Sequence, residues 1–252
     1  MKDKFEKMIK ELFEYTPPSV HTKNCEPFEQ LNRKYISLQE QYANSYQELS
    51  EYIALNEIKR QYAKGGATIH RGFYSPSSLD LVVGGCSRGR LLKSATPEIA
   101  YDYEYVFDSK DDLICCRKYN SGIVSTEFIV YEQDRVLSLV YETDDHHLSF
   151  ISECRYDGSK LLRYESALCA APIGRKNCVE INVESLEYEN GLMKSVLWQR
   201  YTPSLKLLTE EIYRFERDDG GYLSTYTVEQ VGNSCAESEE TTGPYKVLAK
   251  RR

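Results

Sequence analysis

The stretch Leu148-Ser-Phe-Ile-Ser-Glu-Cys-Arg-Tyr156, continued by Asp157-Gly-Ser-Lys-Leu161, decides the fold. In its first part, Leu148, Phe150 and Cys154 alternate with polar neighbours, which is typical of a β-strand with one buried face. The residues Asp-Gly-Ser that follow are typical of a tight turn, and the chain then returns in a second apolar run. The stretch therefore predicts a β-hairpin.

The same pattern recurs along the chain: an aromatic or apolar residue, a turn rich in Asp, Asn and Gly, and a returning Leu. The six copies are anchored at Val83, Phe107, Tyr131, Tyr156, Tyr188 and Phe215. The steps between anchors are 24, 24, 25, 32 and 27 residues, which corresponds to one hairpin per repeat. Six hairpins predict about twelve strands in one long antiparallel β-meander. We expect this sheet to be curved, because so many strands rarely form a flat open sheet.

The N-terminal quarter has a helical period instead. We expect a short helix over residues 1–14 and a longer helical pattern from Glu26-Pro27 to Lys64. The apolar seam of the longer pattern contains Phe28, Leu31, Tyr35, Leu38, Tyr42, Leu49 and Tyr52, and it drifts to Tyr46, Ile53 and Ile58. A coiled coil and a helix packed on a sheet are both compatible with this seam. Its drifting register favours packing on the sheet.

These patterns predict an α+β protein in which N-terminal helices pack on a long curved antiparallel β-meander. The expected parts are a helical segment over residues 1–64, a hairpin-repeat sheet over residues 65–232, and a polar C-terminal tail over residues 233–252. The last part is expected to be frayed because it is rich in glutamate.

Composition excludes several classes of function. The chain has a formal net charge of −7, so it lacks the excess of basic residues that nucleic-acid binding requires. No window of 18 apolar residues indicates a membrane span, and the first residues lack the apolar run of a signal peptide, so we expect a cytoplasmic protein. The eight cysteines include no C-x₂-C pair, which favours free thiols over a structural zinc site.

Candidate catalytic and metal-binding motifs are weak. Asp144-Asp-His-His147 is rich in possible metal ligands, but neighbouring side chains of an extended segment face opposite ways, which favours a solvated turn. The same argument favours one core cysteine, rather than a redox pair, at Cys115-Cys116. Gly84 to Gly89 has the glycine spacing of a phosphate-binding loop but lacks the Lys-Ser/Thr that must follow it. We therefore expect no enzyme, no cofactor and no metal.

Two of the hairpins carry a family resemblance. Tyr156-Asp157-Gly158 with Leu161, and Tyr188-Glu189-Asn190-Gly191 with Leu192, resemble the YD and MORN-type hairpin repeats of bacterial polymorphic-toxin systems. In those systems, small cytosolic immunity proteins are encoded beside the toxins, and some are built from such hairpins. The resemblance covers residues 80–230 and implies an immunity protein that binds and neutralises a cognate toxin.

The turns of the predicted meander also differ in charge. Turns within hairpins, at residues 108–112, 132–135, 157–160, 189–191 and 216–219, carry a net charge of −6. Turns between hairpins, at residues 94–98, 120–122, 143–147, 169–177 and 202–206, carry no net charge. Each set lines one rim of a meander, so the candidate partner-binding residues are Asp108, Asp111, Asp112, Glu132, Asp134, Glu189, Glu216, Asp218 and Asp219. This acidic rim predicts a basic protein partner. The local preference of Asp for turns is the alternative explanation.

A second class of function stays open. The chain has 21 tyrosines, which suit surfaces that are apolar at one end and wet at the other. A tyrosine-lined pocket between the sheet and the N-terminal helices would instead indicate a small-ligand-binding protein or an enzyme. The sequence leaves the oligomeric state open.

Overall fold

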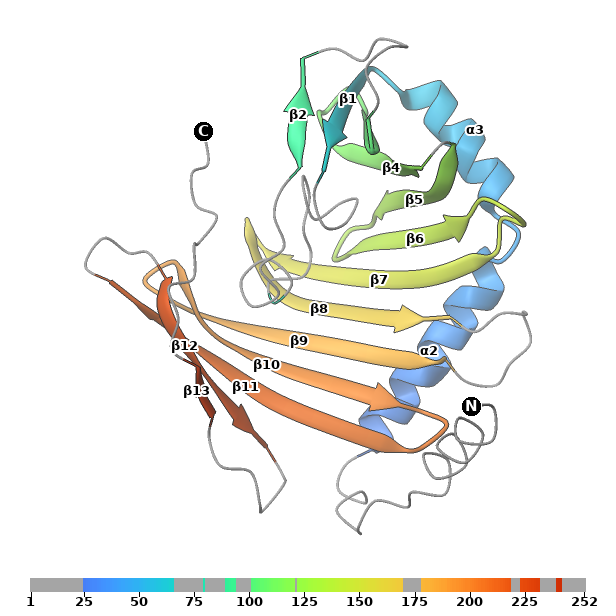
Figure 1. The fold of residues 1–252 in the computed structure, drawn as a ribbon. Coiled ribbons are helices and arrows are strands. Elements are labelled where there is room, and N and C mark those ends of the chain that lie inside the picture. The colour runs from blue at the N-terminus through green and yellow to red at the C-terminus, as the bar shows by residue number, and fades with distance from the viewer. Residues whose placement is uncertain are drawn as a thin grey trace, which may run out of the picture.

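The computed structural model describes residues 25–65, 79, 89–93, 101–120, 122–169, 178–218, 223–231 and 239–241 of the chain. In these residues it contains two helices and one antiparallel sheet of 13 strands (Figure 1). The α+β meander predicted from the sequence is therefore confirmed. The helix predicted over residues 1–14 lies outside the described residues.

Two helices replace the single helical run expected from residue 26 to residue 64. Helix α2 spans Glu26–Tyr42 and helix α3 spans Tyr46–Asn56. Pro27 lies in the first turn of α2, where its missing N–H costs nothing, and the acidic residues there suit the positive end of the helix dipole. The break between the helices falls between Tyr42 and Tyr46, where the apolar seam drifts.

The prediction that the helix continues to Lys64 is wrong. Strand β1 occupies Lys59–Lys64 and pairs with strand β3, Tyr103–Phe107. The chain becomes extended at Glu57, whose backbone N–H caps the end of α3 at the carbonyl of Ile53. The pairing with β3 satisfies the backbone groups of β1 and overrides its local helical pattern. The sheet therefore begins at residue 59 rather than at residue 65.

The remaining strands form a meander. Their bounds are β2 Arg90–Leu92, β4 Leu113–Tyr119, β5 Ile123–Tyr131, β6 Val136–Glu142, β7 Leu148–Asp157, β8 Lys160–Leu168, β9 Glu180–Glu189, β10 Leu192–Thr202, β11 Leu207–Arg217, β12 Leu223–Gln230 and β13 Glu239–Thr241. From β3 to β13, neighbours in the sheet are neighbours in sequence, and β1 lies between β2 and β3. Strand β13 falls in the segment predicted to be a tail, where it pairs with β12.

The predicted turns explain where the strands reverse. Asn190 and Gly191, between β9 and β10, both have positive φ, at 51° and 79°. This conformation belongs to the two-residue hairpin turn whose twist matches that of the strands, and Asn-Gly is its preferred sequence. In the β7–β8 turn only the first loop residue, Gly158, has positive φ, at 57°, which is the position where the other favoured two-residue hairpin turn requires glycine.

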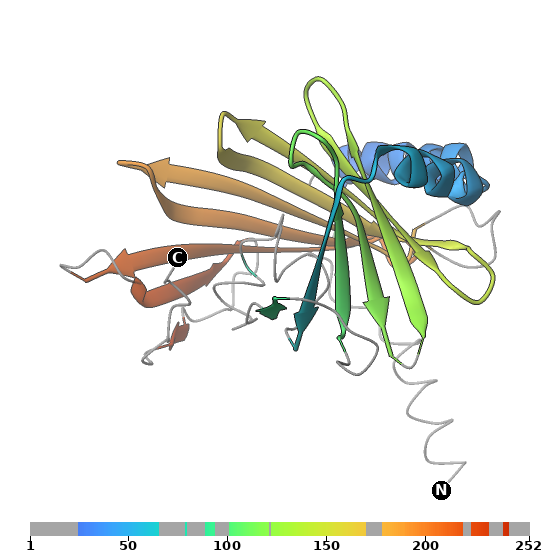
Figure 2. The same cartoon turned by 90° about the horizontal axis from the view of Figure 1, so that it is seen from above.

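The sheet is strongly twisted, as expected for so many strands. Seen from above, the green strands at the N-terminal end run across the direction of the orange strands at the C-terminal end (Figure 2). Both helices lie on the same side of the sheet. We call this side the helix face and the other side the opposite face.

Both faces of the sheet carry buried clusters. On the helix face, residues such as Tyr35 and Ile151 form one cluster between α2, α3 and the sheet. The opposite face carries two further clusters, and Leu79 packs against one of them. Cys115 belongs to the helix-face cluster and Cys116 to an opposite-face cluster, so both are buried, whereas only one was expected to be. The central strands therefore bury side chains on both faces of the sheet.

Candidate functional site

The turns within hairpins lie on one rim of the sheet, as the meander requires. Eight of the nine predicted acidic residues are placed by the structure on this rim, and Asp219 lies outside the described residues. Their separation is large, because neighbouring strands are about 4.8 Å apart and eight such steps divide the β3–β4 turn from the β11–β12 turn, roughly 40 Å in all. Charges at the two ends of the rim are therefore screened from one another at physiological salt. The acidic residues form a long row along the rim rather than one compact patch.

Several of these carboxylates also have local partners. The ammonium of Lys59 lies 2.6 Å from Asp111, Nε of Arg135 lies 2.6 Å from Glu132, and the ammonium of Lys194 lies 3.2 Å from Glu189. Asp108 accepts backbone N–H bonds from within its own turn, at 2.8 and 3.0 Å. Much of the acidity of the rim therefore serves the local structure of the turns.

Helix α3 has apolar side chains on two sides. Ile53 is buried on the helix face of the sheet, and Tyr46 and Leu49 pack beside it. Tyr52 and Leu55, three residues apart and so on one side of the helix, point to solvent, and Ile58 follows them. The exposed fractions of Leu55 and Ile58 are 85% and 71%, the largest among the large apolar side chains that the structure describes. The seam prediction had placed Tyr52 and Ile58 in the interface with the sheet.

Acidic residues lie along this apolar side, and the cations Lys59 and Arg60 follow it directly after Ile58. From Tyr35 to Ile58 the sequence contains four glutamates and neither lysine nor arginine. Glu48 and Glu51 are exposed on α3 itself. Glu57, at the end of the helix, is paired with Arg60, whose hydrogen bond lowers the pKa of the Glu57 carboxyl. The helix therefore presents uncompensated negative charge beside its exposed apolar residues.

Two acidic turns flank α3, one from each rim of the sheet. At its C-terminal end, the backbone N–H of Ile58 donates to the carbonyl of Phe107 at 2.9 Å, which places the turn with Asp111 and Asp112 next to the helix. At its N-terminal end, His146 stacks on Tyr46 with ring centroids 3.8 Å apart, which brings Asp144 and Asp145 close. We call this region the α3 surface, and its members are Glu48, Glu51, Tyr52, Leu55, Ile58, Asp111, Asp112, Asp144 and Asp145.

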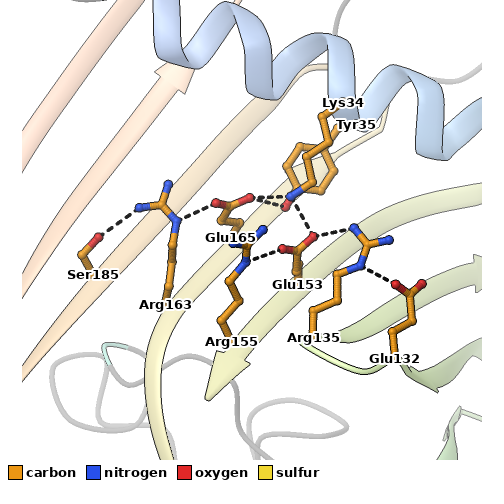
Figure 3. A network of polar contacts seen from close by, with 9 residues as sticks. All are labelled: Lys34, Tyr35, Glu132, Arg135, Glu153, Arg155, Arg163, Glu165 and Ser185. Carbon is orange, nitrogen blue, oxygen red and sulfur yellow. Dashed lines mark hydrogen bonds and ion pairs between the residues drawn. The ribbon is translucent and has the colours of Figure 1, made fainter. Parts of the chain in front are cut away.

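A second cluster of charged residues joins α2 to the sheet (Figure 3). Lys34 of α2 places its ammonium 2.7 Å from Glu153 of β7 and 2.7 Å from Glu165 of β8. These two glutamates face each other across the strands and their side chains are almost completely buried. Arg135, Arg155 and Arg163 approach the same carboxylates at 3.0, 2.9 and 2.6 Å.

The two buried carboxylates are held in the ionised form. Burial acts to raise the pKa of Glu153, but hydrogen bonds from Lys34, Arg155 and Arg135 outweigh it and hold this pKa below its usual range. For Glu165, the bonds from Lys34 and Arg163 likewise outweigh burial and lower the pKa. Every oxygen of the pair accepts a bond from a cation. The pair therefore anchors α2, and it is poorly suited to act as a general acid.

Three tyrosines lie buried between the helices and the sheet. Tyr35, Tyr141 and Tyr201 are completely buried, and their hydroxyl groups donate to Glu165 at 3.4 Å, to the carbonyl of Tyr42 at 2.5 Å and to Glu29 at 2.5 Å. These contacts do not favour a tyrosine-lined pocket at this place.

The other sequence candidates occupy structural positions. In the 143–147 turn, Nδ1 of His147 contacts Asp145, and His146 is used in the stacking on Tyr46. Within the described ranges, no group of three or more His, Cys, Asp or Glu side chains could hold a metal ion. Burial raises the pKa of the Cys115 thiol to about 12 and that of Cys116 well above its usual range, so both are poor nucleophiles. Residues 84–88 of the glycine-rich stretch lie outside the described residues.

Comparison with protein-family models finds no match to this chain, and no curated protein matches it. In the part of the chain that the structure describes, none of the helices has the length and apolar character needed to cross a membrane.

Proposed function

We propose that this protein is a protein–protein interaction module that binds a basic protein partner through the α3 surface. The observation that carries the proposal is that α3 is apolar on two sides, while the sheet covers only one of them. A helix that is apolar on two sides is normally buried on both. An exposed apolar centre with a charged border is also the common anatomy of a protein-binding surface.

The charge of the border supports a basic partner. Glu48 and Glu51 lie on the helix, and the acidic turns at 108–112 and 143–147 lie at its two ends. Charge of one sign around an interface raises the association rate of an oppositely charged partner and disfavours partners of like charge.

In its sharpest form, the proposal is that the partner is the toxic domain of a polymorphic-toxin protein, which this chain neutralises as an immunity protein. This form rests on the resemblance of the Tyr-Asp/Glu…Gly…Leu hairpins to repeats of those systems. The structure supplies two hairpins of that sequence, β7–β8 and β9–β10.

The test replaces the exposed apolar residues by lysine in the variant Leu55→Lys/Ile58→Lys. Leu205→Lys is the matched control, because Leu205 is 63% exposed in the β10–β11 turn, away from α3. Candidate toxin domains are sought among large secreted proteins encoded by adjacent genes, and binding is measured by surface plasmon resonance. We expect the double variant to bind at least about ten-fold more weakly and the control to bind as the native protein does.

A protection assay tests the sharper form. Cells that express the toxin domain should grow when the native protein or the Leu205→Lys control is co-expressed, and should fail to grow with the double variant. Equal growth with all three proteins would contradict the α3 surface as the neutralising site. Binding without protection would support an interaction module and contradict the immunity function.

A further inference from the structure

The charged cluster beside α2 contains two arginines whose hydrogen-bonding capacity is largely unused. Arg155 and Arg163 are directly opposite each other on β7 and β8, each two residues from its partner in the buried pair Glu153 and Glu165. Both lie on the helix face beside α2 (Figure 3). They are the exposed members of the cluster, with side chains that are 51% and 38% accessible.

Each of these guanidinium groups is fixed at one edge and free at the other. Arg155 donates from Nε to Glu153 at 2.9 Å, and Arg163 donates from Nε to Glu165 at 2.6 Å. Arg163 also donates from one terminal nitrogen to the hydroxyl of Ser185 at 3.3 Å. Since a guanidinium carries five N–H groups, most donors of the two side chains have no acceptor among the described residues. The carboxylates hold the two forks in place before any ligand arrives.

The cluster has an excess of donors rather than of charge. Its cations are Lys34, Arg135, Arg155 and Arg163, and its carboxylates are those of Glu132, Glu153 and Glu165, with Asp134 near enough to act on Arg155. Glu153 and Glu165 are already saturated by their cations. An added acceptor must therefore come from outside the cluster.

We propose that Arg155 and Arg163 form a binding site for a phosphoryl group of a small molecule. Two adjacent guanidinium forks offer parallel pairs of N–H donors, and a phosphoryl group presents three oxygens that can accept them from two directions. The hydroxyl of Ser185, already in contact with Arg163, lies at the border of the site. This site is separate from the α3 surface and does not depend on the partner proposed above.

The experiment titrates the full-length protein with inorganic phosphate and with glycerol phosphate at constant ionic strength, followed by calorimetry, with chloride as reference. We expect saturable binding of phosphate to the native protein. The variant Arg155→Lys/Arg163→Lys keeps the charges and the ion pairs but loses the planar forks, so its affinity should fall at least about ten-fold. Tighter binding of glycerol phosphate than of inorganic phosphate would identify an organic phosphate as the ligand, and equal binding would identify free phosphate.

The control is Arg214→Lys, because Arg214 of β11 has the same accessibility of 51% and pairs with Glu229 at 2.7 Å. It should bind phosphate as the native protein does. Both variants keep the charge of the native protein. Unfolding midpoints close to that of the native protein, measured without phosphate, show that the variants are folded. A native protein that binds phosphate no better than chloride, or a control variant that loses binding as the double variant does, would overturn the proposal.

Discussion

Helices α2 and α3 lie on the same face of one sheet, but they are held in different ways. Helix α2 buries one side, including Phe28, Tyr35 and Leu38, and places Lys34 between two buried carboxylates. Helix α3 has one buried residue, Ile53, and leaves Tyr52 and Leu55 in solvent. The first helix is therefore part of the core, whereas the second is attached along one side and exposes another. The difference separates the residues that maintain the fold from those available for a partner.

The largest expected effect is on the attachment of α2. Replacing Lys34 by Met removes the cation shared by Glu153 and Glu165 and leaves two carboxylates facing each other in a buried site. Breaking a buried ion pair costs about 3–5 kcal/mol, and since three arginines remain we expect the free energy of unfolding to fall by about 2–3 kcal/mol. Chemical denaturation measures it, with Arg33→Met on the exposed side of α2 as the control. Equal stability of both variants would show that Lys34 does not anchor the helix.

The same cluster predicts how stability depends on pH. The pKa values of Glu153 and Glu165 lie below the ordinary value of 4.5 in the folded protein, so the unfolded chain binds more protons in acid. The stabilisation is complete above the unfolded pKa and is lost as the pH falls from about 5 through the folded pKa. The Lys34→Met variant should lose less between pH 6 and pH 3, because its carboxyl pKa values are no longer lowered by the lysine. Denaturation at several pH values tests this, and parallel curves for the two proteins would be contrary to it.

The next expected effect concerns the charges around α3. Replacing Asp111, Asp112, Asp144 and Asp145 by Asn removes negative charge from the turns at both ends of the helix. We expect association with the partner to slow roughly ten-fold at low salt and little at high salt.

The control set for this prediction lies on the part of the acidic rim from the β7–β8 turn onward and removes the same number of charges. It is Asp157→Asn, Glu189→Gln, Glu216→Gln and Asp218→Asn. Stopped-flow association rates separate the two surfaces. If the control set slowed association as much as the α3 set, the whole rim rather than the α3 surface would be the binding site.

The smallest expected effect is the change in stability when an exposed side chain of α3 is shortened. Leu55→Ala removes an apolar side chain that is exposed in the folded protein, so the free energy of unfolding should change by no more than about 0.5 kcal/mol. The buried control for this variant is Ile53→Ala, two residues earlier, which should cost about 2–4 kcal/mol as a core truncation does. Thermal and chemical denaturation of this pair measure the contrast between the two sides of the helix. A large loss for Leu55→Ala would mean that its side chain is covered.

The sequence predicted five of the hairpins, from β3–β4 to β11–β12, because the signals for them are local. The hairpin anchored at Val83 is not found in the described residues: β2 pairs with β1, and residues 80–88 lie outside the described ranges. Asn190-Gly191 and Gly158 supply the backbone conformation of their turns, and alternation within strands such as β9 sets which residues face inward. A meander follows from such signals directly, since each strand pairs with the next in the chain. The extra strand β1 was missed because its pairing with β3, 40 to 48 residues later, leaves no local mark.

What the sequence alone determined was the antiparallel meander, its helical beginning and the acidic character of its turns. The tertiary structure decided which charges lie together. The turns with Asp111 and Asp144 are on opposite rims and far apart in the hairpin pattern, yet α3 spans the sheet between them. Likewise, the pairing of Glu153 with Glu165 and their contact with Lys34 depend on strand register and on the position of α2. Turn and strand signals act between neighbours in sequence, whereas these contacts arise only when the twisted sheet and the helices pack against each other.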